Sequence, residues 1–208
     1  MEGIVLTSAY VGNCQFYSKL ASHPTILLEQ HCHYAKQTYR NRCNIATANG
    51  VMSLSIPTVK PQTEKCKTKD IRIDNSQNWQ QIHWRALESG YNSSPFFDYY
   101  RDDLFPFYDK QFDYLLDYNS AIQDVVLELL DIECTVQLTE EYNSYADSVD
   151  YRDKISAKKQ LEDIHFSPQP YYQVFAHKFG FLPNLSILDL LFNMGNESIL
   201  TLQKSYIP

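Results

Sequence analysis

IVLTSAYVGNCQFYSKLASHPTILL, residues 4–28, is the stretch that decides the fold. Residues 4–9 form an apolar run typical of a strand, residues 13–21 have the apolar spacing of a helix, and residues 25–28 form a second strand-like run. Two strands joined by a short helix make a β-α-β unit. This unit indicates an α/β fold.

A hairpin is predicted after this unit. Residues 44–48 and 52–58 are strand-like and are joined through Asn49-Gly50, a dipeptide whose two residues both tolerate positive φ. We therefore expect a small mixed β-sheet. A lysine-rich mobile loop at residues 60–70 and a short strand at 71–73 should follow.

The second half has helical and aromatic patterns. A helix from Trp79 presents one face, formed by Trp79, Ile82, His83, Ala86, Leu87 and Tyr91. Residues 91–114 are rich in aromatic side chains and contain Pro95 and Pro106, so we expect several short helices packed through their rings. A base-stacking surface is disfavoured because basic residues are almost absent there. Residues 120–123 have a capping-box sequence, which predicts a helix to Leu130.

The last third is expected to add a late strand and C-terminal helices. We predict a strand at 135–138, a polar surface excursion at 140–167, a helix near 171–179 and a buried helix at 185–193. The chain is interpreted as one domain over 1–208, with a mainly sheet-forming part at 1–75, a helical part at 76–132 and the remainder at 133–208.

Composition limits the class of protein. The chain has 208 residues, of which 44% are hydrophobic, enough for a sizeable core. No apolar run reaches the roughly 20 residues that cross a bilayer, and the N-terminus lacks the features of a signal peptide. We therefore expect a cytoplasmic protein with no membrane partner. The five cysteines are scattered and form no CxxC, which favours reduced thiols.

Charge is distributed unevenly along the chain. Residues 1–75 carry nine Lys and Arg against five Asp and Glu, a net +4, whereas residues 76–208 carry nine against twenty, a net −11. The basic first part suits a small anionic or nucleotide-activated ligand, and the acidic remainder argues against nucleic-acid binding. A solvated surface with uneven charge would have the same composition.

Polar residues crowd the segment directly after the second strand, EQHCHYAKQTYRNR at 29–42. Glu29 is a candidate general base or a partner for a cationic substrate group, and its alternative role is an ion pair with Arg42 or Lys36. Lys36, Asn41 and Arg42 supply donors for an anionic ligand or an oxyanion. Charged strand-edge positions in water remain the alternative for them.

Histidines and cysteines near this segment have weaker signals. Glu29, His31 and His33 would share a face if the strand continued, but no distant Cys/His pair completes a metal site, so we predict no metal. His83, between two tryptophans, is a candidate acid or base, or a hydrogen-bonded core histidine. Cys32 and Cys43 are minor candidates for a thiol nucleophile.

Asp189 and Asn193 stand four residues apart in the predicted buried helix. They either cap the two ends of that helix, Asp189 together with Ser186, or form a polar pair at the floor of a pocket. Tyr10, Asn13, Trp79 and Tyr91 complete the predicted ligand-binding set. The chain contains no GxxxxGK[ST], GxGxxG, GxSxG or HExxH motif, so we predict no cofactor and expect any transferred group to arrive already activated.

The order of these segments resembles the WbqC-like family. The resemblance runs through NCQFYSK, LLEQHCHYAKQTYRNRCNI, NGVMSLSIP, DIRID, NWQQIHWRALESGYNSSPFFDYY and PNLSILDLLFNMG, and covers about residues 6–195. Positions that match recurrent family positions are Lys19, Glu29, Lys36, Asn41, Arg42, Trp79, His83, Tyr91 and Pro95. The chain departs from the family pattern at Ala9-Tyr10, where Gln-Pro is usual, and at Tyr39, where Trp is common.

The resemblance implies a role in O-antigen or other surface-polysaccharide synthesis, for which transfer of an amino acid such as glycine to a sugar has been proposed. The expected function is therefore a transferase that joins an activated acyl or aminoacyl group to an amino sugar, usually nucleotide-linked. Glu29 or His83 would remove the proton, and Lys36, Asn41 and Arg42 would hold the donor. The alternative is a non-catalytic protein that binds a sugar nucleotide in the same pathway.

Overall fold

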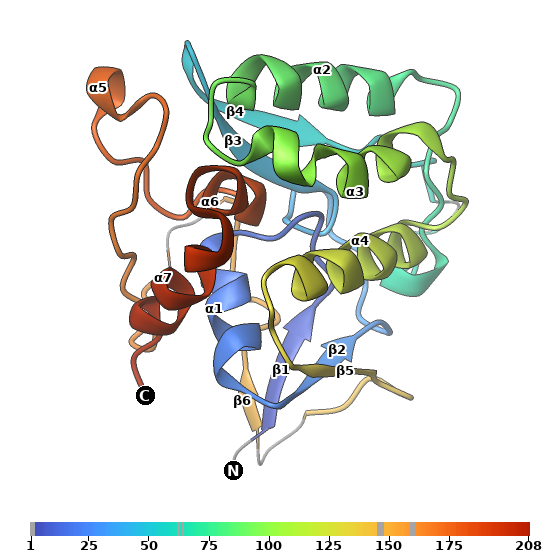
Figure 1. Ribbon diagram of the computed structural model, residues 1–208. Helices are drawn as coiled ribbons and strands as arrows, with labels where there is room; N and C mark the ends of the chain where they lie inside the picture. Colours follow the sequence, from blue (N-terminus) through green and yellow to red (C-terminus); the bar gives the residue numbers. More distant parts are fainter. Residues whose placement is uncertain (1–2, 62, 64, 145–147, 159–160) are drawn as a thin grey trace.

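The computed structural model describes residues 3–61, 63, 65–144, 148–158 and 161–208 (Figure 1). The elements in chain order are β1 Gly3–Thr7, α1 Cys14–Ser22, β2 Thr25–Glu29, β3 Arg42–Thr47, β4 Gly50–Ser55, η1 Thr68–Asp70, α2 Trp79–Tyr91, α3 Phe97–Asp109, α4 Leu115–Leu129, β5 Thr135–Leu138, β6 Ser148–Asp150, α5 Ala176–Phe179, α6 Ile187–Met194, η2 Gly195–Glu197 and α7 Ser198–Ser205.

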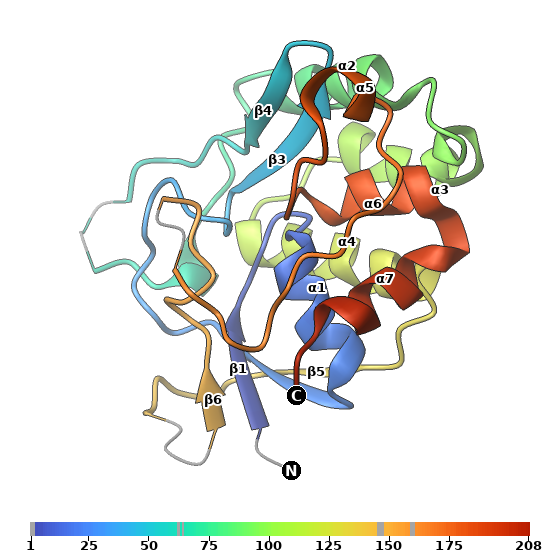
Figure 2. The ribbon, with the colours of Figure 1, turned by 90° about the vertical axis from the view of Figure 1, so that its left-hand side faces the viewer.

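Four parallel strands form the larger sheet, in the order β5-β2-β1-β6. The chain steps from β1 to β2 to β5 in one direction and then returns to place β6 on the other side of β1. The sheet therefore has a topological switch point between β1 and β6, and such switch points are where open α/β sheets bind ligands. Figure 2 shows α1, α4 and α7 together on one side of β1.

The hairpin β3–β4 forms a second, antiparallel sheet. The predicted α/β fold is confirmed, with its β-α-β unit, its hairpin and its aromatic helical half, but the hairpin is not hydrogen-bonded into the parallel sheet. Its turn is also displaced by one residue from the prediction. Thr47 pairs with Gly50, so Ala48 and Asn49 form the loop, and of the predicted Asn-Gly pair Gly50 alone has positive φ, at 104°.

Helix α2 packs across the hairpin, and Gly90 allows this close approach. A Cβ at Gly90 would lie 2.8 Å from the carbonyl oxygen of Ala46 in β3. The buried face of α2 includes the expected Trp79 and His83, but Ile82, predicted on that face, is 63% exposed. Tertiary packing therefore rotates α2 slightly about its axis, so that the buried face differs from the one that the apolar spacing alone predicts.

Two helical predictions in the aromatic part are wrong. Residues 97–109 form one helix, α3, which contains Pro106 near its end, instead of several short helices. The predicted helix towards Leu130 is present as α4, but it begins at Leu115, so Ser120 lies inside it and the predicted capping box is wrong. The aromatic rings still make the contacts between elements, as Trp84 of α2 packs against both Phe97 and Tyr108 of α3.

The C-terminal part differs most from the prediction. The predicted strand 135–138 is confirmed as β5, and the predicted buried helix is confirmed as α6, whose residues from Ile187 to Asn193 are all buried. The polar stretch 140–167 was expected to be a surface excursion, yet it contributes β6 to the sheet. Because β6 has three residues, its sequence is too short to show strand alternation.

Candidate functional site

The carboxyl ends of the four parallel strands lie at one edge of the sheet, which we call the carboxyl edge. Glu29, the last residue of β2, lies there with a fully buried side chain. Its Oε1 accepts hydrogen bonds from the backbone N–H groups of His31 and Cys32, and the Thr139 hydroxyl donates to the same oxygen over 3.4 Å. Strand ends that meet at one edge therefore surround this carboxylate with donors.

Arg152 provides the cation for Glu29 from the far side of β1. Its Nη1 lies 3.3 Å from Glu29 Oε2, while its Nε donates to both Asp150 oxygens over 3.0 Å. Burial alone would raise the pKa of Asp150, but the hydrogen bonds from Arg152 outweigh it and lower that pKa. The ring of Tyr142 covers the guanidinium, with 4.8 Å between its centroid and Cζ. Glu29 therefore forms an ion pair, which was its predicted alternative role, but its partner is Arg152 and not Arg42 or Lys36.

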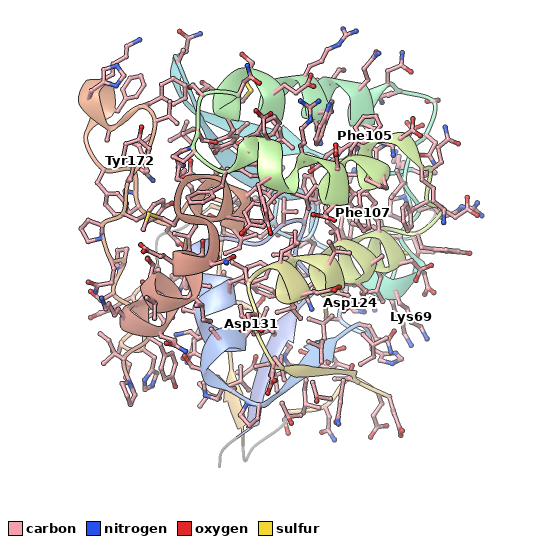
Figure 3. All side chains as sticks on the ribbon, viewed as in Figure 1. Lys69, Phe105, Phe107, Asp124, Asp131 and Tyr172 are labelled. Carbon is pink, nitrogen blue, oxygen red and sulfur yellow. The ribbon has the colours of Figure 1, made fainter. Side chains whose placement is uncertain are left out.

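Lysines and histidines surround the carboxyl edge. The turn η1 binds the segment after β2, because Thr68 N–H donates to Cys32 O and Lys69 N–H to Gln30 O. Lys69 is labelled in Figure 3 at this edge. Lys36 is exposed, as are His33 and Lys67, which form a backbone bridge with each other. The region around the buried carboxylate therefore has positive charge available at its surface.

The three residues considered for a metal do not continue one strand face. Strand β2 ends at Glu29, and the ring Nε2 of His31 lies 3.1 Å from Thr139 O. In the described parts of the chain, no group of three or more His, Cys, Asp or Glu side chains is gathered as metal ligands. His31 instead helps to hold the segment after β5 against the end of β2.

A small cavity of about 10 Å³ lies at the switch point between β1 and β6. Asn13, the N-cap of α1, lines it; its Oδ1 accepts from Phe16 N–H, while its buried Nδ2 makes no hydrogen bond within the described structure. Burial raises the pKa of the neighbouring Tyr39. The volume suits a single water molecule, so this cavity is part of the edge and not a separate substrate pocket.

His83 lies in a separate, aromatic cluster. Its Nδ1 is 2.9 Å from the hydroxyl of Tyr10, and its ring packs against Trp79 with centroids 5.2 Å apart. Burial lowers the pKa of His83 to about 4, although a backbone group of Ser55 opposes that change. The imidazole is therefore neutral near pH 7, and it is enclosed, with 4% of the residue exposed.

Asn41 and Arg42 lie at the start of the hairpin. Asn41 Nδ2 donates to Ile56 O over 2.9 Å, and Arg42 Nε donates to Ser55 Oγ over 3.1 Å. Arg42 and His83 thus approach the same residue, Ser55. No hydrogen bond, ion pair or ring contact in the described structure joins either of them to Glu29. These contacts therefore do not gather Glu29, Arg42 and His83, the candidate bases and the candidate donor-binding arginine, around one centre.

Asp189 is the centre of a third cluster, in α6. It accepts hydrogen bonds from Tyr91 OH over 2.8 Å, Tyr171 OH over 2.7 Å and Gln173 Nε2 over 3.0 Å. Burial raises the pKa of Asp189 to about 6, against the effect of these three donors. The predicted partnership with Ser186 in a cap is wrong for the Asp189 side chain, and Asn193 Nδ2 donates to the Asp189 carbonyl.

The structure therefore divides the predicted residues into groups. Glu29 and Asn13 lie at the carboxyl edge; Tyr10, Trp79 and His83 form the aromatic cluster; Tyr91, Asp189 and Asn193 belong to α6 and its contacts; and Asn41 and Arg42 lie at the start of the hairpin. Lys36 is exposed. The sequence interpretation missed Thr139 and Arg152, which complete the carboxyl edge. Both follow strands that contribute to the edge, and recognising β6 would have predicted the position of Arg152.

Lys19 has a structural role in this arrangement. Its fully buried ammonium lies 2.9 Å from Asp163 Oδ2 and donates to His165 O. It also lies over the rings of Tyr151 and Tyr206. Burial lowers the pKa of Lys19, and Asp163 opposes this change. The residue thus fixes the segment after β6, which includes Arg152, against α1.

Comparisons with known proteins give one family and one relative. A sequence model of the WbqC-like protein family matches residues 8–161. The chain is 24% identical over 221 residues to "Uncharacterized protein Rv1507c" of Mycobacterium tuberculosis, an alignment that covers 93% of this chain and 94% of that protein. No solved structure matches the chain. Within the described residues, no helix is long and apolar enough to cross a bilayer.

Proposed function

We propose a transferase function for this chain, which belongs to the WbqC-like protein family. In the proposed reaction an activated acyl or aminoacyl group, such as glycyl, is joined to the amine of an amino sugar during surface-polysaccharide synthesis in the cytoplasm. The amine nitrogen attacks the acyl carbon, the bond to the activating group breaks, and a base takes the proton that the amine releases. No bound cofactor is part of this proposal.

The buried pair of Glu29 and Arg152 at the carboxyl edge is the observation that carries the proposal. In an α/β sheet this edge is the usual place for a ligand. The guanidinium of Arg152 has the planar geometry that suits a phosphate or carboxylate, and exposed Lys67, on the segment bound to the residues after β2, adds positive charge. An anionic donor is therefore the ligand class that fits this edge.

Glu29 is the proposed base, and the ion pair controls when it acts. While Arg152 holds the carboxylate, Glu29 is occupied by a cation and by three further donors. A phosphate that draws Arg152 away would leave Glu29 able to take a proton from the attacking amine. His83 receives a different role from the one expected: its enclosed, neutral ring positions Tyr10.

A second candidate, a non-catalytic protein that binds a sugar nucleotide, is favoured by one observation. Glu29 has a full set of internal partners and no exposed surface. A carboxylate in this state is as well suited to stabilising the edge as to catalysis. The same anionic ligand would bind in both cases, and the two functions differ only in turnover.

Mass spectrometry of mixtures of the protein, UDP-glucosamine and a glycyl thioester tests the proposal. We expect a glycylated product with the wild-type protein and loss of turnover in Glu29→Gln, with little change in affinity measured by calorimetry. The matched control is Glu88→Gln, which changes a carboxylate paired with Arg101 at the surface and should retain activity. Binding without product supports the second candidate, and neither binding nor product contradicts both.

A further inference from the structure

A cavity lies away from the carboxyl edge, between α3 and the end of α6. Its volume is about 410 Å³, within the range of about 300–1,000 Å³ that is usual for small-molecule sites. Aromatic side chains from the start of α3 form one wall, and residues of α6 and η2 form the other. None of the residues singled out at the carboxyl edge lines it.

Asn193 is one of the residues that line this cavity, and its amide oxygen is a buried acceptor. The residue is 3% exposed, and its Oδ1 makes no hydrogen bond in the described structure. Its orientation is fixed because Nδ2 donates to Asp189 O over 2.7 Å, and a flipped amide would place two oxygens together. A buried polar atom without a partner is costly. The free atom is therefore an oxygen that requires a donor.

The other polar groups of the cavity agree with a donor ligand. Glu197, at the exposed rim, adds a carboxylate. Asn196 Oδ1 is already used by the hydroxyl of Tyr100 over 2.9 Å. Among the described residues that line the cavity, none carries a positive charge. This lining disfavours phosphates and carboxylates and favours a ligand with ammonium and hydroxyl groups.

Aromatic rings give the cavity an apolar wall. Tyr99 is 72% exposed and packs edge-on against Tyr100, with centroids 4.8 Å apart. Phe96 is held against η2, because a Cβ at Gly195 would lie 2.8 Å from its ring. An exposed aromatic ring beside hydrogen-bonding groups suits a ligand that has one apolar face and several donors.

We infer that this cavity binds an amino sugar in its ammonium form. The ammonium pairs with Glu197, a ring hydroxyl donates to Asn193 Oδ1, and the C–H face of the sugar packs on Tyr99. A quaternary ammonium group would leave Asn193 without a donor, and a neutral sugar would leave Glu197 without a cation. The inference does not rest on the transfer reaction, because no residue of the carboxyl edge takes part.

NMR titration of the ¹⁵N-labelled full chain with glucosamine, below the pKa of its amine, tests this site. We expect shifts of the Asn193 side-chain amide and of the backbone amides of η2. N-acetylglucosamine, which lacks the charge, should bind about tenfold more weakly, and glucose 6-phosphate should not move these signals. Glucosamine shifts that occur only at the carboxyl edge, or equal binding of the three probes, would overturn the inference.

Two surface substitutions give an independent check. Glu197→Gln and Tyr99→Ala should each weaken glucosamine binding, by about fivefold, without unfolding the chain, because both side chains are exposed. The matched controls are Glu128→Gln on α4 and Tyr172→Ala, a 56% exposed tyrosine on another segment, labelled in Figure 3. Equal affinity in test and control variants would also reject the site.

Discussion

Two buried carboxylates have different partners in the two halves of the molecule. At the carboxyl edge, Glu29 is paired with the guanidinium of Arg152. In the helical half, Asp189 receives only neutral donors within the described structure, the hydroxyls of Tyr91 and Tyr171 and the amide of Gln173. Equal burial therefore gives the two carboxylates different electrostatics, because a buried charge is tolerated where a cation offsets it and is costly where its partners are all neutral.

Removing the cation from Glu29 should have the largest effect. In Arg152→Met the carboxylate stays buried without its counter-charge, and we expect the free energy of unfolding to fall by about 3–5 kcal/mol. Urea denaturation at pH 7 measures this loss. The matched control is Arg101→Met. Arg101 lies 3.4 Å from Glu88, close to the 3.3 Å between Arg152 and Glu29, but the side chains of Arg101 and Glu88 are 38% and 39% exposed. The control should cost about 0–1 kcal/mol, and equal losses would contradict the comparison.

His83 should destabilise the fold as the pH falls. Its folded pKa is about 4 against an ordinary value of 6.5, so the unfolded chain takes up the proton first. The stability that neutral His83 supports is therefore present above pH 6.5 and is lost towards pH 4, by about 3 kcal/mol. Denaturation of wild type and His83→Gln across this window measures the difference. A variant with the same acid sensitivity as wild type would refute the assignment of a neutral buried imidazole.

The pH dependence of stability that Asp189 contributes should have the opposite sign to that of His83, over an overlapping pH range. Its folded pKa of about 6 lies above the ordinary 3.8, so the folded chain holds the proton longer. The stability that protonated Asp189 contributes is present at low pH and is lost as the pH rises through 6. The expected loss is about 3 kcal/mol, because the pKa of Asp189 is shifted by slightly less than that of His83. In Asp189→Asn this loss should disappear, and the difference between variant and wild type should grow from pH 4 to 7. An unchanged difference would show that Asp189 does not titrate there.

The smallest change in the free energy of unfolding is expected for Tyr99, a residue that is mostly exposed, unlike the two buried carboxylates. Because the side chain is 72% exposed, Tyr99→Ala should change the free energy of unfolding by no more than about 0.5 kcal/mol. The same denaturation assay measures it. A loss above about 1 kcal/mol would mean that the ring supports the fold, and its effect on glucosamine binding could not then be assigned to the cavity.

Local pattern was enough to predict part of the fold. Strands β1, β2 and β5 and helices α1 and α6 follow runs whose apolar spacing is visible in the sequence. Helix α3 was not predicted as one helix, because Pro106 normally interrupts a helix. Strand β6 was missed because its three residues are held by pairing with β1, from which more than a hundred residues separate it.

The candidate site was predictable to the same extent. Glu29 was found because it ends a strand followed by a polar cluster. Arg152 was not found, because the ion pair joins residues 123 positions apart and depends on β6. His83 is buried and hydrogen-bonded, as in the core-histidine alternative that the sequence left open, but the sequence gives no sign that Tyr10 and Trp79 enclose it. Local signals thus identify single residues, whereas long-range strand order decides which of them meet.

The most direct measurement is an NMR map of UDP-glucosamine bound to the full chain. If the carboxyl edge is the ligand site, amide shifts will gather after the ends of the parallel strands, at Glu29 to Cys32, Thr139 and Arg152, and Arg152→Lys will weaken binding. Shifts confined to the hairpin, to α2 or to the cavity beside α3, or no binding at all, would contradict a site at the carboxyl edge.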